Sequence, residues 1–160
     1  MPRLIIEVGA EEWTTIVTEA IRALPQETGG ILMGRWVGPT AALVTDVIGP
    51  GPNASHRATS FDPDQAWQET EVARTWAARL GGVAYLGDWH THPGGWPRPS
   101  REDRIAADLI AASNDSGVHR PTMLIVGIRS DGALNPAVYV WSKRHLDKAN
   151  LLVGHGRRFH

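Results

Sequence analysis

Residues 90–103 contain two histidines, a serine and an acid at a spacing that suits metal chemistry. The segment reads HTHPGGWPRPSRED and follows the apolar run VAYLGDW, which is typical of a strand. Side chains two apart on a strand point to the same side, so His90 and His92 would present both imidazoles to one point. A helix beginning at Ser100 would bring Asp103 in from its first turn. Three protein ligands with one open position are the arrangement of a catalytic zinc site.

Each part of this pattern also has an ordinary explanation. A lone His-x-His is common by chance, and Ser100 with Asp103 forms a Ser-x-x-Asp arrangement that caps helices. The two roles are compatible, because a cap at a helix N-terminus also fixes the direction of its side chains. The combination at one spacing favours the metal site.

A distant acid adds a candidate general base. Glu27 lies in PQETGGILMG, between the end of a predicted helix and the start of a predicted strand. By position alone, a solvated loop glutamate is the more ordinary interpretation. The functional interpretation is a base for metal-activated water, since that role needs a carboxylate near the metal but not bound to it.

Together these residues resemble the complete signature of the JAMM metalloproteases, also called MPN-plus or JAB domains. The matching positions are Glu27, His90-x-His92-Pro93, Ser100 and Asp103, and the resemblance covers about residues 3–142. It implies a cytidine-deaminase-like α/β fold and one zinc ion (Zn²⁺) per chain, held by His90, His92 and Asp103. It also implies that Glu27 acts as the base and that Ser100 helps to stabilise the oxyanion.

The resemblance also implies a class of substrate. Eukaryotic deubiquitinases of this family carry long insertions that clamp ubiquitin, whereas here only residues 104–120 separate the motif helix from the next predicted strand. The compact form resembles prokaryotic JAB proteins, some of which lie beside ubiquitin-activating and ubiquitin-conjugating-like enzymes, while others process sulfur-carrier proteins. We therefore expect hydrolysis after the tail of a ubiquitin-like or sulfur-carrier-like protein, with E1-like or E2-like enzymes encoded nearby.

Three other functions compete with this interpretation. A zinc nucleobase deaminase needs a Pro-Cys-x-x-Cys pair, and this chain has no cysteine. A non-haem iron oxygenase also uses two histidines and a carboxylate, but usually in a jelly-roll, which the predicted helices disfavour. The alternative that stays open is a non-enzymatic MPN scaffold. Such members typically lack part of the metal set, so metal analysis of the purified protein separates the two.

Composition limits the class of protein. The 160 residues predict one domain, and a formal charge of -1 excludes a basic nucleic-acid binder. No stretch approaches the roughly 18 apolar residues of a membrane helix, and the first apolar run is too short for a secretion signal. We therefore expect a cytoplasmic protein without nucleic-acid or membrane partners. Without cysteine, any metal must bind His, Asp or Glu.

Hydrophobic periodicity predicts an α/β domain. The predicted elements are a strand at 3–8, a helix at 13–24, a hairpin from GGILMGRWVG and ALVTDVIG, an irregular loop at 49–60, a helix capped by Asp62, the strand VAYLGDWH, a helix from Ser100, and the strands TMLIVGI and AVYVWS. The hairpins indicate a mixed sheet flanked by helices. We assign residues 1–145 to this single layered domain and 146–160 to a C-terminal tail.

Two tryptophans are further candidates for a role near the predicted site. Trp89 and Trp96 flank the metal loop, where packing is the ordinary role and a wall for an extended peptide is the functional one. His56 lies in the predicted loop, and we expect a surface histidine without a special role.

Overall fold

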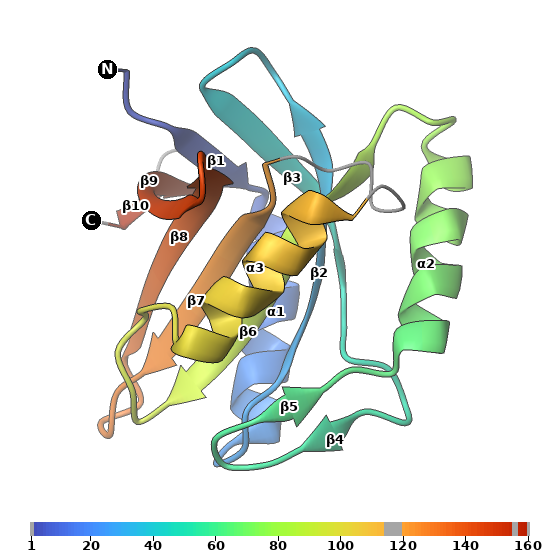
Figure 1. Cartoon of the computed structure of the whole chain (residues 1–160). Helices are drawn as coiled ribbons and strands as arrows, with labels where there is room; N and C mark the ends of the chain where they lie inside the picture. Colours follow the sequence, from blue (N-terminus) through green and yellow to red (C-terminus); the bar gives the residue numbers. More distant parts are fainter. Residues whose placement is uncertain (1, 114–119, 155–156, 160) are drawn as a thin grey trace.

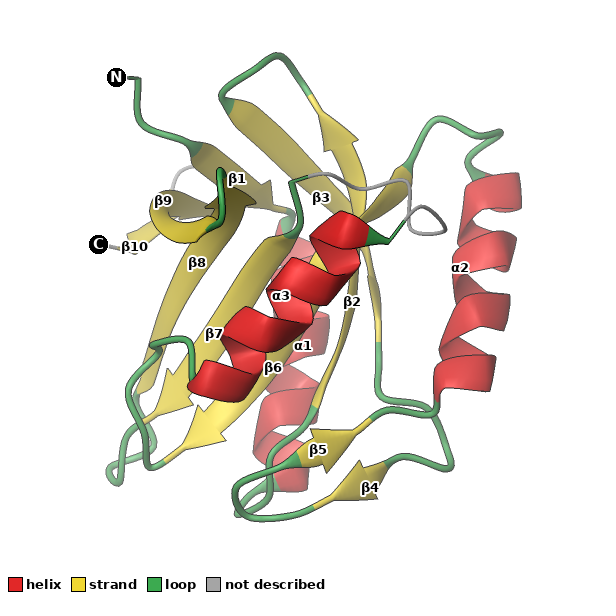
Figure 2. Ribbon diagram, in the orientation of Figure 1, coloured by secondary structure: helices red, strands yellow, loops and turns green. Residues whose placement is uncertain are grey.

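A mixed eight-stranded sheet forms the centre of the protein, with helices on both faces (Figures 1 and 2). The computed structural model describes residues 2–113, 120–154 and 157–159. The strands of the sheet are β1 (Ile5–Val8), β2 (Gly29–Trp36), β3 (Ala41–Ile48), β6 (Ala84–Pro93), β7 (Thr122–Ile128), β8 (Leu134–Ser142), β9 (His145–Val153) and β10 (Arg157–Phe159). The remaining elements are the helices α1 (Ala10–Ala23), α2 (Gln65–Ala78) and α3 (Arg101–Ala112) and the small hairpin of β4 (Ser55–His56) and β5 (Phe61–Asp62).

The strand order confirms the predicted mixed sheet. It runs β1-β3-β2-β6-β7-β8-β9-β10, and the pairs β1–β3, β1–β9 and β6–β7 are parallel while the others are antiparallel. The predicted hairpin is the antiparallel pair of β2 and β3. Because β1 pairs with both β3 and β9, the pairings form a closed circuit of seven strands.

Strand β7 shows how the sheet separates two layers of core. All seven of its residues are buried, as expected for a strand covered on both faces. Leu124 and Val126 belong to the main core, to which α1 contributes Trp13. Ile125 points to the other face and packs with Ala107 of α3. Helix α1 therefore covers one face and α3 the other, as Figure 1 shows.

The start of α2 corrects the predicted cap. Asp64 is the N-cap and accepts a hydrogen bond from the Trp67 N–H at 3.3 Å. Asp62 lies instead in β5, where its carboxylate pairs with Arg57 at 2.9 Å. The predicted irregular loop also contains β4, a strand of two residues that is too short for periodicity to reveal.

The expected C-terminal tail is largely part of the sheet. Strand β9 pairs with β8 and also with β1, and it buries Leu151 and Val153 in the main core. The sequence prediction was wrong here because β1, at the other end of the chain, is a partner that no local pattern reveals. Residues 155, 156 and 160 of the expected tail lie outside the described residues. None of the helices in the described ranges has the length and apolarity needed to cross a bilayer.

Candidate metal centre

Strand β6 directs two imidazoles to one face of the sheet. His90 lies opposite Gly29 of β2 and beside Ile125 of β7, so this part of β6 is paired on both sides. The Nε2 atoms of His90 and His92 are 3.1 Å apart. Thr91, between them, is fully buried, and its hydroxyl oxygen accepts a hydrogen bond from a backbone N–H at 3.0 Å. The central position of the strand thus holds the histidine pair in place.

The first turn of α3 supplies the carboxylate. Ser100 Oγ accepts from the Asp103 N–H at 3.1 Å, and the Ser100 N–H donates to Asp103 Oδ2 at 2.8 Å, which is a complete capping box. The same Oδ2 atom lies 3.2 Å from His90 Nε2 and 3.6 Å from His92 Nε2. The cap therefore fixes the carboxylate against both imidazoles.

The three donor atoms fit a tetrahedral zinc ion. Neighbouring corners of a tetrahedron with bonds of about 2.0–2.1 Å are separated by about 3.3 Å. The observed separations run from 3.1 to 3.6 Å, and His90, His92 and Asp103 form a group able to hold a metal. Three nitrogen and oxygen donors leave one corner of the tetrahedron for water or substrate.

A backbone carbonyl orients the second imidazole. His92 Nδ1 donates to the carbonyl oxygen of Trp96 at 2.9 Å. Since a carbonyl only accepts, Nδ1 carries the proton and Nε2 keeps its lone pair for a metal. The Trp96 side chain itself is 72% exposed, whereas Trp89 is 1% exposed and donates to the Ile48 carbonyl oxygen. The packing expected for both tryptophans applies only to Trp89.

The electrostatics favour a positive charge between the three ligands. Burial raises the pKa of the Asp103 carboxyl, but hydrogen bonds from His90 and His92 outweigh it and hold that pKa well below its usual range. The hydrogen bond to Asp103 raises the pKa of His92, against the opposing effect of burial. A cation at this point satisfies the same groups that otherwise share protons.

Glu27 lies on the wall of the same cavity without belonging to the ligand group. It sits in the loop between α1 and β2, and its N–H donates to the Arg57 carbonyl oxygen at 2.7 Å. Burial raises the pKa of the Glu27 carboxyl, partly offset by positive charge on His92 and His90. A carboxylate beside the ligands but outside them is the placement that the sequence predicted.

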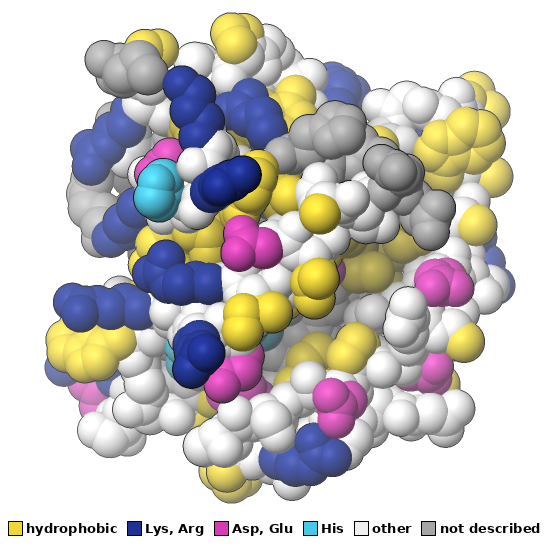
Figure 3. Space-filling model, in the orientation of Figure 1, with side chains coloured by type: hydrophobic (Ala, Val, Ile, Leu, Met, Phe, Trp, Pro, Cys, Tyr) yellow, Lys and Arg dark blue, Asp and Glu magenta, His cyan; other side chains and the backbone are white. Residues whose placement is uncertain are grey.

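The cavity extends well beyond the metal ligands. Its volume is about 510 Å³, and its walls include residues 59–63 of the β4–β5 hairpin, Gln68 of α2, and Glu102 and Ala106 of α3. Figure 3 shows the face that carries α3, where the surface is hollowed beside this helix toward α2. The space therefore accommodates a segment of a substrate as well as an ion.

Two residues at this site were missed or undervalued in the sequence. Asp88 lines the cavity, accepts a hydrogen bond from the Tyr85 hydroxyl at 3.0 Å, and has a pKa raised to about 6 by burial. The sequence did indicate its position, because Asp88 precedes His90 by two residues, the same strand period that links His90 and His92. His56, expected to have no special role, has its Nδ1 atom 2.9 Å from the carbonyl oxygen of Glu27.

Comparison with known proteins identifies the family. A family model described as prokaryotic homologs of the JAB domain matches residues 10–142. The chain belongs to this family. The probable metalloprotease y4qB of Sinorhizobium fredii is 34% identical over 128 residues, which are 79% of this chain and 77% of that protein.

Two further relatives of this JAB domain are named CD-NTase/cGAS isopeptidases. The protein from Enterobacter hormaechei is 34% identical over 114 residues, covering 70% of this chain and 61% of that protein. The protein from Vibrio cholerae is 27% identical over 124 residues, covering 78% and 76%. The solution structure of protein DSY2949 from Desulfitobacterium hafniense has a TM-score of 0.70 with 24% identity over 92% of both chains, and this likeness shows the fold.

Proposed function

We propose that this JAB-family protein is a zinc-dependent isopeptidase or peptidase that cuts the amide bond after the C-terminal tail of a ubiquitin-like protein. The observation that carries the proposal is the convergence of His90 Nε2, His92 Nε2 and Asp103 Oδ2 within 3.6 Å, beside the separate carboxylate of Glu27. The relatives named metalloprotease and isopeptidase support a JAMM-type hydrolase. An intact ligand set favours this function over the scaffold alternative.

The ligand atoms favour zinc as the metal. Two imidazole nitrogens and one carboxylate oxygen with an open position are typical of catalytic zinc sites. Zinc bound by His90, His92 and Asp103 would supply a Lewis acid for the amide carbonyl and for the attacking water.

Glu27 would move the proton. Its carboxylate accepts a proton from the attacking water and returns it to the departing amine, so one residue serves as base and then as acid. Partial burial raises the pKa of Glu27, which makes this carboxylate a stronger base than a solvated one. Its exclusion from the ligand group leaves the carboxylate free for this exchange.

Ser100 would stabilise the developing negative charge on the carbonyl oxygen. Its Oγ atom accepts from the Asp103 N–H, and within the described residues its hydroxyl has no acceptor of its own. The proton of that hydroxyl is thus available to the substrate oxygen, whose charge grows as the tetrahedral species forms. Ser100 serves as cap and oxyanion donor at once.

The cavity walls suit an extended tail. The β4–β5 hairpin offers backbone groups along one wall, and a strand-like segment is held by such groups. The exposed Trp96 ring stands beside the metal loop as a second contact surface. We therefore propose a ubiquitin-like or sulfur-carrier-like protein as the partner, conjugated or extended at its C-terminus, with E1-like or E2-like enzymes encoded nearby and a cytoplasmic location. The names of the relatives make conjugates of CD-NTase proteins the first to test.

The test uses zinc-loaded protein and C-terminal fusions of the ubiquitin-like protein encoded nearby. Intact mass should locate one cut directly after the tail of the modifier, and Glu27→Gln protein should leave the fusion whole. Cuts elsewhere in unrelated unfolded proteins, with the folded fusions intact, would replace this proposal by a general peptidase. A protein purified without stoichiometric metal, and inactive after zinc loading, would support the scaffold.

A further inference from the structure

The backbone N–H and carbonyl oxygen of Glu27 are held by two neighbouring residues, His56 of β4 and Arg57 directly after it. The Glu27 N–H donates to the Arg57 carbonyl oxygen at 2.7 Å, and the Glu27 carbonyl oxygen accepts from His56 Nδ1 at 2.9 Å. Glu27 and Arg57 are 30 positions apart in the sequence, so this double contact is a product of the fold. The bond from His56 is made by its side chain, so a substitution at this position can remove it.

We infer that His56 is a positioning residue that fixes the carboxylate of Glu27 relative to the metal ligands. The inference rests on the proposed role of Glu27 as the base. A carbonyl oxygen only accepts, so His56 must carry a proton on Nδ1 for the bond to exist. Misplacement of a reacting group by about 1 Å costs roughly a hundredfold in rate, so an anchor one residue from the base has a direct kinetic consequence.

The His56 ring is fixed in turn against the strand that follows Glu27. The centroid of the His56 ring lies 5.4 Å from that of the Phe61 ring, and Phe61 is the residue opposite His56 in the β4–β5 hairpin. A Cβ atom added to Gly29 would be 3.0 Å from the Phe61 ring and 3.0 Å from His90 Cβ, so Phe61 packs against the backbone at Gly29. His56 thereby links the loop of the base to the strand pair that holds the first metal ligand.

Thr28, the residue after Glu27, is also anchored by hydrogen bonds. The Thr28 N–H donates to Thr91 Oγ1 at 3.0 Å, and the Thr28 hydroxyl donates to Glu19 at 2.8 Å. Thr28 is fully buried, whereas Glu27 is only partly so. Without the His56 bond, the peptide that joins Glu27 to Thr28 would keep the Thr91 bond at its N–H but lose the bond at its carbonyl oxygen.

Two variants separate the hydrogen bond from the packing of the ring. His56→Phe keeps a ring beside Phe61 but has no donor, and His56→Asn has an amide nitrogen near the place of Nδ1. We expect His56→Phe to lower kcat roughly tenfold to a hundredfold with KM within about twofold, and His56→Asn to stay within about threefold of the wild type. Zinc stoichiometry should be the same in all three proteins.

Two readouts do not depend on catalysis. In wild-type protein, ¹⁵N NMR should show the His56 ring protonated at Nδ1. Hydrogen exchange at the Glu27 amide should be roughly tenfold faster in His56→Phe and restored in His56→Asn, since one lost hydrogen bond releases the loop locally. A wild-type protein that cleaves no fusion refutes the proposed function, while these two measurements still decide the role of His56.

Three results would contradict the positioning role of His56. An unprotonated Nδ1, unchanged kcat in His56→Phe, or His56→Asn as impaired as His56→Phe at equal unfolding temperature would each overturn the inference. If His56→Phe does not fold, His56→Gln takes its place, because its amide lies near the position of Nε2 and leaves the Glu27 carbonyl without its donor. Wild-type kcat in that variant would overturn the inference equally.

Discussion

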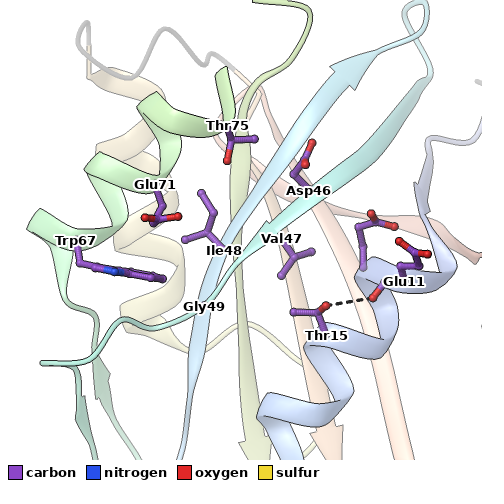
Figure 4. A pocket seen from close by; sticks show the side chains of 10 residues that line it. Glu11, Thr15, Asp46, Val47, Ile48, Gly49, Trp67, Glu71 and Thr75 are labelled. Atoms are coloured by element: carbon purple, nitrogen blue, oxygen red, sulfur yellow. Dashed lines mark hydrogen bonds between the residues drawn. The ribbon is translucent and has the colours of Figure 1, made fainter. Parts of the chain in front are cut away.

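Two hollows in the described part of the protein are each lined by several acids, and of these two the hollow at β6 and α3 gathers the metal ligands. Figure 4 shows the second hollow, a cavity of about 300 Å³ between α1 and α2 with Glu11, Asp46 and Glu71 on its walls and Val47 and Trp67 among its apolar contacts. No histidine is among the described residues that line it. The cavity of about 510 Å³ at β6 and α3 has carboxylates as well, but there they meet imidazoles.

The acids of the two hollows have different partners. In the α1–α2 hollow, Asp46 pairs with Arg79 at 2.9 Å and Glu71 with Arg74 at 2.8 Å, and both arginine side chains are at least half exposed. Ion pairs between exposed, long side chains contribute little to stability and do not fix the positions of their charged atoms. At the metal centre, His90 and Asp103 are 15% and 18% exposed and project from a paired strand and a capped helix turn. Rigid support and a mixed ligand set, rather than negative charge, distinguish the candidate site.

The largest expected effect is the loss of metal. His92→Ala should abolish stoichiometric zinc binding, because two remaining ligands leave the ion largely to water. Asp46→Asn in the other hollow should bind one zinc per chain as the wild type does. Metal analysis after dialysis checks both, and full zinc occupancy in His92→Ala would remove His92 from the ligand set.

Removing the base should separate catalysis from metal binding. Glu27→Gln should keep zinc and fold while activity falls by roughly a hundredfold to ten-thousandfold, the contribution of a general base. The parallel change Glu71→Gln should leave activity unchanged. Activity on a modifier fusion and zinc content are measured together, and loss of both in Glu27→Gln would make Glu27 a ligand.

Ser100→Ala tests whether the cap of α3 is also an oxyanion donor. We expect a rate loss of about 10²- to 10³-fold, together with about 0.5–2 kcal/mol of lost stability from the missing cap. The matched control is Asp64→Ala, which removes the cap of α2 and should reduce the free energy of unfolding without a comparable rate loss. Denaturant titration measures the change in the free energy of unfolding, and kcat measures the change in rate. An unchanged rate would show that Ser100 serves only as a helix cap.

The smallest effect should come from the ion pairs of the α1–α2 hollow. Arg79→Ala breaks the contact with Asp46, but Arg79 is on the surface and salt already screens the pair. The midpoint of thermal unfolding should change little, and less at high salt. A large shift that persists at high salt would show that this hollow is structurally organised like the metal centre.

Local patterns predicted the parts of this site that local geometry builds. The His-x-His pair depends only on the two-residue period of a strand, and the direction of the Asp103 side chain depends on a capping box that spans Ser100 to Asp103. The α/β class and the central strands also followed from periodicity. For these features, residues a few positions apart determine the outcome, so the sequence by itself was sufficient.

Only the tertiary structure decided the contacts between distant segments. The strand from His145 to Val153 finds its parallel partner at Ile5–Val8, and His56 finds the carbonyl of Glu27 across 29 positions. Asp88 is only partly exposed on the wall of a cavity that residues of α2 and α3 also line, which its own neighbours in the sequence do not reveal. Pairing and burial of this kind depend on how the whole chain packs, because each needs a partner whose position is set by the sheet rather than by adjacent residues.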